Sequence, residues 1–238
     1  MNCYWYKGNW TDTKGNVGDM VSPIIVNHLA GYPPSRAHKD DKGKLLAVGS
    51  VISFLREGDF VWGSGVIKPV KIPFYENVTF KMLRGKLTRE WLIKSGYDVP
   101  KVYGEPCFLL PWIIKRHDNK KRKIGIVAHY AEKAEAMKMY PDSYFIDVLT
   151  TPEKFVSEIC ECEKILSSSL HGIVIAEAYG IHAGWFQITK KIIGGDFKFF
   201  DYYSESGRTP VKCKYMPLPE VDIDVIIKSF PYELCTLR

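Results

Sequence analysis

Short apolar runs alternate with amphipathic stretches along this chain of 238 residues, a pattern typical of layered α/β folds. In the first half, the apolar runs predict strands at Lys44–Gly49, Asp59–Trp62 and Val78–Leu83. Helical spacing predicts helices at Val17–Leu29, Val51–Arg56 and Lys86–Ser95. Glycines at 31 and 96 follow two of these helices, as expected for helix ends.

The same alternation begins again after a charged run, Lys115–Lys123, which we interpret as a solvated linker rather than a nucleic-acid-binding patch. Strands are predicted at Lys123–Ala128, Tyr144–Val148, Lys164–Ser168 and Ala183–Ile188. Helices are predicted at Pro152–Glu163, Leu170–Tyr179 and Val221–Ser229. We therefore expect two Rossmann-like lobes, residues 1–117 and 118–238, that face a cleft.

Ligands of open parallel sheets bind beyond the carboxyl ends of the strands, so the residues just after each predicted strand are the first candidates for a site. They are Gly49-Ser50, Trp62-Gly63-Ser64-Gly65, Arg84-Gly85, His129-Tyr130, Thr150-Thr151 and Ser167–Gly172. This set contains glycines, hydroxyl groups, one arginine and two histidines. Such a combination indicates a catalytic cleft that binds an anion.

The turn Ser167–Gly172 carries the strongest of these signals. Three serines before a predicted helix supply hydroxyls and free N–H groups for an anion, and His171 can exchange a proton near neutral pH. The alternative is that Ser168 or Ser169 caps the helix and His171 faces solvent.

Three further positions have a functional and a structural interpretation. His129 at a strand end contacts a substrate or is a buried structural histidine. Arg84 clamps a carboxylate or phosphate, or it forms a salt bridge between the lobes. The turn Gly15–Asp19 lets a ligand approach the backbone, or Asp19 only places a charge at a helix start.

Composition narrows the choice of partners. The net charge of +6 suits an anionic small substrate or an acidic membrane surface, but the basic residues are too scattered for a nucleic-acid binder. Six cysteines without C-x-x-C spacing favour a reducing compartment, so we expect a cytoplasmic protein. No run approaches the ~20 apolar residues of a membrane span, which leaves peripheral association as the possible membrane contact.

The spacing of the histidines and carboxylates predicts no metal site, and there is neither a dinucleotide fingerprint nor a P-loop. A G-x-S-x-G elbow of serine hydrolases is also missing. We therefore expect anion binding with acid–base chemistry and no cofactor.

The order of the short motifs resembles that of polysaccharide pyruvyl transferases. These motifs are Gly15–Asp19, Val48-Gly49-Ser50, Trp62–Gly65, Arg84-Gly85, Tyr103-Gly104-Glu105-Pro106 and Ser168–Gly172. Together they extend roughly from residue 8 to residue 208. His129-Tyr130 and Lys198–Tyr202 further resemble the branch that forms pyruvate ketals on exopolysaccharides.

This resemblance implies transfer of pyruvate from phosphoenolpyruvate to a hexose, with a cyclic ketal as product and a GT-B-like pair of lobes. The implied acceptor is a lipid-linked oligosaccharide at the inner face of the cytoplasmic membrane, on the side of the first lobe; phosphoenolpyruvate would bind on the side of the second. The implied catalytic residues are His171, as general acid, and Arg84. The implied substrate-binding residues are Asn16, Gly18, Asp19, Ser64, Gly65, His129, Tyr130, Ser168, Ser169 and Lys198.

One position departs from the family pattern. Many members have an arginine where this chain has Ser169, and Arg208, Lys198 or His129 are the candidate replacements. Two other functions therefore remain open. A GT-B-like glycosyltransferase would hold a nucleotide ribose with a carboxylate such as Glu177, and a non-catalytic polysaccharide-assembly protein would need neither role. The oligomeric state does not follow from the sequence.

Overall fold

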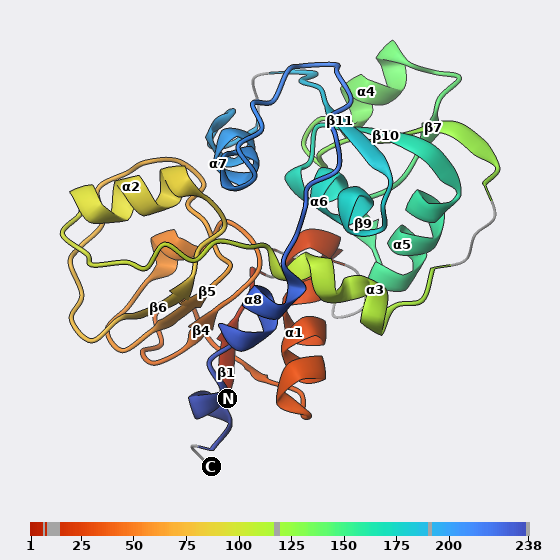
Figure 1. Cartoon of the computed structure of the whole chain (residues 1–238). Helices are drawn as coiled ribbons and strands as arrows, with labels where there is room; N and C mark the ends of the chain where they lie inside the picture. The colour runs from red at the N-terminus through yellow and green to blue at the C-terminus, as the bar shows by residue number, and fades with distance from the viewer. Residues whose placement is uncertain (7, 9–14, 117–119, 190–191, 237–238) are drawn as a thin grey trace.

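Two separate parallel sheets, each flanked by helices, make up the protein (Figure 1). The computed structural model describes residues 1–6, 8, 15–116, 120–189 and 192–236. A mixed α/β fold with parallel sheets is therefore confirmed. The predicted lobe boundary at 117/118 lies outside the described residues, as does the middle of the predicted linker.

The first sheet comes from the first 82 residues and has the order β3-β1-β4-β5-β6, with every pair parallel. Its strands are β1 (Asn2–Tyr4), β3 (Ser35–Arg36), β4 (Leu45–Leu46), β5 (Phe60–Trp62) and β6 (Thr79–Met82). The three strands predicted in this region are present, although each is shorter than its apolar run. The two remaining strands, β1 and β3, were not predicted.

The second sheet has the order β11-β10-β7-β8 and is also parallel throughout. Its strands are β7 (Arg122–Val127), β8 (Tyr144–Phe145), β10 (Cys162–Ser167) and β11 (His182–Trp185). Four strands were predicted here, and all four are found. The prediction that a helix continues to Glu163 is wrong, because β10 already begins at Cys162, where its Sγ contacts the carbonyl oxygen of Glu158.

The helices that cover the sheets include all those predicted except the one at Val51–Arg56. They are α1 (Val17–Ala30), α2 (Lys86–Lys94), α3 (Leu110–Ile113), α4 (Lys133–Met139), α5 (Pro152–Cys160), α6 (Leu170–Ala178), α7 (Phe197–Glu205) and α8 (Ile223–Lys228). Short 3₁₀ turns are η1 (Ile52–Phe54), η2 (Pro106–Leu109) and η3 (Tyr232–Cys235). The helix predicted at Val51–Arg56 is thus only the turn η1. Sequence patterns did not predict α3, α4 or α7.

The N-terminal end of α1 is fixed to the second half of the chain. A two-stranded antiparallel ladder pairs β2 (Gly15–Asn16) with β9 (Leu149–Thr150), and Val17 N–H donates to the carbonyl of Val148 at 2.9 Å. Because α1 also packs against α3, α5 and α6, one apolar core runs from the first sheet into the second. This ladder brings the turn after residue 15 to the carboxyl end of β10.

The C-terminal part of the chain crosses back to the first sheet. Helix α7 packs on α2 (Figure 1), and the indole N–H of Trp62 on β5 donates to the carbonyl of Ile226 in α8 at 3.1 Å. Side chains of α7 therefore lie where the two sheets approach each other. Within the described residues, no helix is both long and apolar enough to cross a membrane.

Candidate active site

A cavity of about 580 Å³ lies where the start of α1, the loop after β7, the start of α6 and the start of α7 meet. Seven of the twelve candidate residues line it: Asn16, Asp19, His129, Tyr130, Ser169, His171 and Lys198. Residues from four separate stretches of sequence thus converge on one space. Its volume suits a small ligand.

The serine turn that precedes α6 holds its own backbone in place. Ser167 Oγ accepts from the N–H of Ser169 at 3.0 Å, and Ser168 Oγ accepts from the N–H of His129 at 2.9 Å. Ser169 occupies the N-cap position, but its hydroxyl makes no capping hydrogen bond to any described residue. The cap interpretation is therefore wrong for Ser169, whose side chain lines the cavity instead.

The imidazole of His171 fits against the backbone of α1. A Cβ at Gly18 would lie 1.9 Å from His171 Nδ1, so only glycine leaves room for this ring. His171 Nε2 is buried and finds no hydrogen-bond partner among the described residues. Burial and the positive charges of Lys198 and Arg84 lower the pKa of His171 to about 3, so the ring is neutral at pH 7. Gly18 thus positions the histidine rather than receiving a ligand.

Two other ionisable groups in the cavity have pKa values near neutrality. Burial raises the pKa of Asp19 to about 7, although the charge of Lys198 opposes this shift. Burial and the nearby Arg84 lower the pKa of Lys198 to about 8. Burial lowers the pKa of His129 to about 4, and Lys198 contributes to that shift. At pH 7, Lys198 is therefore the charged cation of this group.

The guanidinium of Arg84 is enclosed in the wall of the cavity. Its side chain is buried, Nε donates to Asp201 Oδ2 at 2.9 Å, Nη1 to Ser50 Oγ at 2.7 Å and Nη2 to the Val66 carbonyl at 3.0 Å. This is the salt-bridge alternative for Arg84, formed between the segment that follows β6 and helix α7. Direct contact of Arg84 with a substrate stays a prediction.

Ser64 and Gly65 support this wall instead of lining the cavity. Ser64 Oγ donates to the carbonyl of Gly49 at 3.0 Å and accepts from the N–H of Val51. A Cβ at Gly65 would lie 2.3 Å from the Arg84 guanidinium carbon, so this glycine makes room for the arginine. Asn16 has a double role, because it caps α1 through the N–H of Gly18 and also lines the cavity.

Several residues that shape the site were not assigned a role from the sequence, although Ser50 was among the candidates after strand ends. Ser50 lines the cavity and holds Arg84, and its position directly after a predicted strand was the available signal. Glu132 is buried, accepts from Thr189 and raises the pKa of Lys198, but no motif marks it. The outer part of the cavity is apolar and aromatic, with Tyr6, Phe54, Ile67 and Ile193.

In the described part of the chain, no three His, Cys, Asp or Glu side chains are grouped as metal ligands would be. Of the proposed replacements for the missing arginine, Arg208 is held by Glu177 through two contacts of 2.9 Å. Lys198 lines the cavity and, within the described residues, makes no hydrogen bond. Of the three candidates, Lys198 is therefore the one that both lines the cavity and carries a positive charge at pH 7, whereas Arg208 is bound to Glu177. The role of Lys198 in place of the missing arginine stays a prediction.

A family model described as polysaccharide pyruvyl transferase matches residues 32–187. The chain belongs to this family. The matched range includes the serine turn with His171, Arg84 and the loop with His129, whereas Lys198 lies beyond it. The suspected relationship to polysaccharide pyruvyl transferases is thereby confirmed.

An uncharacterized protein of Acanthamoeba polyphaga mimivirus is similar to this pyruvyl transferase family member, with 30% identity over 172 residues. The similarity covers 67% of this chain and 59% of the viral protein. The chain therefore spans less than two thirds of the length of this curated relative. No solved structure matches the chain.

Proposed function

We propose that this protein transfers the pyruvyl group of phosphoenolpyruvate to a hexose of a polysaccharide precursor and forms a cyclic ketal. The observation that carries this proposal is the meeting of Lys198, His171 and Asp19 in one cavity, whose volume and cation suit a small anionic ligand. Membership in the polysaccharide pyruvyl transferase family supports the same reaction class.

The cavity offers phosphoenolpyruvate two kinds of contact. Its phosphate and carboxylate are anions, and the buried ammonium of Lys198 attracts anions strongly because little water screens it. The N–H groups at the start of α6 add hydrogen-bond donors beside Ser169. The orphaned Nε2 of His171 would gain a partner when the ligand binds.

The reaction that we assign needs one proton donor and a path for two protons from the acceptor. A proton adds to the methylene carbon of phosphoenolpyruvate, and a sugar hydroxyl attacks the neighbouring carbon and loses its proton. The carbon–oxygen bond to phosphate then breaks, a second hydroxyl closes the ring, and its proton is also lost. One of the two released protons replaces the one consumed, and the other leaves with phosphate.

We assign the proton donation to His171. Its ring is neutral in the empty cavity, so it must first gain a proton, and the negative charge of bound phosphoenolpyruvate would raise its pKa. Asp19, with a pKa of about 7, is protonated part of the time at neutral pH and is suited to exchange protons within the same cavity. Binding of the donor substrate would thus itself prepare the acid.

The acceptor sugar would approach from the aromatic outer part of the cavity. Tyr130 is exposed there, and its ring lies 4.3 Å from the ring of His129. Aromatic faces of this kind suit the apolar face of a hexose. We further propose a GT-B-like arrangement in which the first half of the chain binds the acceptor. The acceptor would be lipid-linked, and the protein would associate peripherally with the cytoplasmic face of a membrane.

The direct test is phosphate release from phosphoenolpyruvate by the purified protein, with and without polysaccharide-derived acceptors. We expect release that depends on the acceptor, and a product whose mass shows an added pyruvate ketal. Release that is independent of any acceptor would contradict the transfer. Absence of release with every acceptor, while phosphoenolpyruvate still binds, would favour a non-catalytic assembly protein.

A nucleotide-sugar glycosyltransferase is less well supported by the site. Its candidate ribose ligand, Glu177, is buried, accepts a hydrogen bond from Tyr202 Oη at 2.6 Å and is paired with Arg208. That carboxylate is therefore occupied within the protein. A rise in melting temperature with nucleotide sugars but not with phosphoenolpyruvate would reverse this preference, since ligands of the native state raise it.

A further inference from the structure

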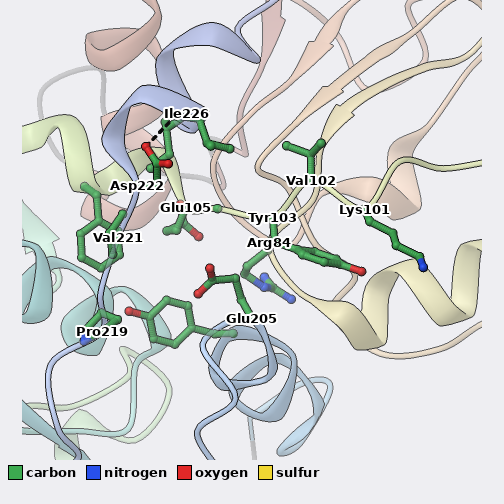
Figure 2. Close-up of a pocket in the computed structure, with 14 residues that line it drawn as sticks. Arg84, Lys101, Val102, Tyr103, Glu105, Glu205, Pro219, Val221, Asp222 and Ile226 are labelled. Atoms are coloured by element: carbon green, nitrogen blue, oxygen red, sulfur yellow. Dashed lines mark hydrogen bonds between the residues drawn. The ribbon is translucent and has the colours of Figure 1, made fainter.

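A second cavity, of about 320 Å³, lies on another side of Arg84 (Figure 2). It is formed by the segment after β6, the end of α7 and the segment around α8. The residues used below are Tyr103, Glu105, Phe108, Glu205, Asp222 and Lys101, all of which line it. Its lining includes Arg84 but none of the residues that line the first cavity.

Glu105 is the feature of this cavity that most needs an explanation. Its side chain is only 2% exposed, and the Cys107 thiol, the Cys107 N–H and the charge of Arg84 all act on its carboxyl group. Even so, neither carboxyl oxygen makes a hydrogen bond of normal geometry to any described residue. It precedes η2 but makes no capping hydrogen bond to that turn. A buried carboxyl group without hydrogen bonds of good geometry lowers the stability of the folded protein. The presence of Glu105 in the wall of a cavity therefore points to a ligand that supplies hydrogen-bond donors.

The other polar groups of the second cavity also favour a ligand that donates hydrogen bonds. Glu205 and Asp222 add two more carboxyl groups, and Figure 2 shows Glu105, Glu205 and Arg84 around the same space. Burial raises the pKa of Glu205, as it does that of Glu105, which reaches about 7. Phosphoenolpyruvate, with its negative charges, is therefore a poor ligand for this cavity.

Hydroxyl groups fit this lining better than a charged amine. A carboxyl group that is partly protonated at neutral pH gives a cation little attraction, and the cations Arg84 and Lys101 line the same cavity. Tyr103 and Phe108 supply aromatic surface between the polar groups. Carboxyl groups that accept from hydroxyls, together with aromatic faces, are what a sugar ring requires.

We propose that the second cavity is a separate carbohydrate-binding site that holds a hexose unit of the polysaccharide, through Glu105, away from the unit that receives pyruvate. The polysaccharide as ligand rests on the proposed function. The site would add affinity for long acceptors, because a second contact on the same chain raises the effective concentration of the first. Short acceptors would not benefit.

Nuclear magnetic resonance of the ¹⁵N-labelled protein tests whether this cavity binds sugar. The probes are the methyl pyranosides of glucose, galactose and mannose, and the readouts are the backbone amides of Gly104, Cys107 and Val225. We expect saturable shifts of these amides with at least one glycoside, also in the presence of saturating phosphoenolpyruvate. Shifts with none of the three, up to their solubility limits, would overturn the proposal.

Two variants locate the binding. Glu105→Gln keeps the shape and removes the carboxylate, and should weaken the glycoside about tenfold or more. Val225→Trp adds a bulky ring to the partly exposed Val225 of α8, which lines the cavity, and should abolish binding. Thermal melting confirms that each variant is folded. Unchanged affinity in both folded variants would contradict the site, and binding of methylamine instead of glycosides would contradict the sugar.

Turnover separates this inference from the proposed function. With a long glycan acceptor, Val225→Trp should raise the KM for the glycan about tenfold, with kcat, the KM for phosphoenolpyruvate and the KM for a single-hexose acceptor unchanged. Equal KM values for the glycan in both proteins would remove the second cavity from acceptor binding. Absence of turnover in wild-type protein that still binds glycosides at Gly104 would contradict the proposed function alone.

Discussion

The two cavities beside Arg84 differ in charge although one helix serves both. Helix α7 presents Lys198 to the first cavity, Asp201 to the wall and Glu205 to the second. These positions are three and four residues apart, the spacing at which side chains share one side of a helix. The first cavity thus contains an ammonium and two neutral histidines, whereas carboxyl groups dominate the second.

This difference shows how a thin wall can separate two kinds of chemistry. The Arg84–Asp201 pair is buried and lies between the groups of both cavities, so each charge is compensated within the wall. We therefore expect an anion on the side of Lys198 and, as proposed above, a hydroxyl-rich ligand on the side of Glu105. A variant in one cavity should therefore leave ligand binding in the other cavity unchanged.

The largest expected effect is on the chemistry of the first cavity. His171→Ala should lower acceptor-dependent phosphate release about 10²–10⁴-fold, the range typical for loss of a general acid. His182→Ala is the matched control, because that histidine on β11 is exposed and contacts the carbonyl of Met216. Glycoside binding at the second cavity should be unchanged in both variants. Equal phosphate release from both would refute the assignment of His171.

Loss of the Arg84–Asp201 salt bridge should lower the stability of the whole protein rather than affect the ligand binding of one cavity. Asp201→Asn breaks a pair that is fully buried, so we expect the free energy of unfolding to fall by about 3–5 kcal/mol. Lys228→Ala, which removes an exposed ion pair with Asp224, should cost about 1 kcal/mol or less. Urea unfolding measures both. Similar losses in the two variants would mean that the wall is not a stabilising element.

The smallest expected effect concerns the affinity for phosphoenolpyruvate. Lys198→Ala should weaken binding about 10–100-fold, the equivalent of one charge-assisted contact. Since the pKa of Lys198 is about 8, the wild-type ammonium loses its proton as the pH rises through 8, and affinity should fall there. Calorimetric titration from pH 6 to pH 9, a range chosen to bracket that pKa, measures this.

Lys198→Arg provides the control for that titration. An arginine keeps its charge throughout the range, so binding should be restored and its decline above pH 8 should disappear. An alkaline decline that is identical in Lys198→Arg would show that another group causes it.

Much of the fold was predictable because periodic burial leaves a direct trace in the sequence. The buried strand β4 and the carboxyl-terminal halves of β7 and β10 follow short apolar runs, whereas the first halves of β7 and β10 include exposed polar residues. Helix α7 was missed because its buried side includes the polar residues Lys198 and Asp201, and because its contacts with α2 come from the first half of the chain. Such long-range packing is invisible to a local pattern.

The candidate site, like the fold, has features that the sequence predicted and features that it did not. The rule that ligands bind beyond strand ends placed His171, His129 and Ser169 in one cavity, because parallel strands of one sheet end at a common edge. The same rule could not predict the salt bridge between Arg84 and Asp201, because Asp201 lies 117 positions further along the chain. Nor could it show that Gly18 serves the histidine ring rather than a ligand.

The most direct test of the central claim is the protonation state of His171 when phosphoenolpyruvate binds. Long-range ¹H–¹⁵N spectra of the imidazole, assigned with the His171→Ala variant, distinguish the neutral ring from the charged one. We expect a neutral ring at pH 7 without ligand and a protonated ring with saturating phosphoenolpyruvate. A ring that stays neutral in the bound protein would contradict the role of His171 as the acid of this cavity.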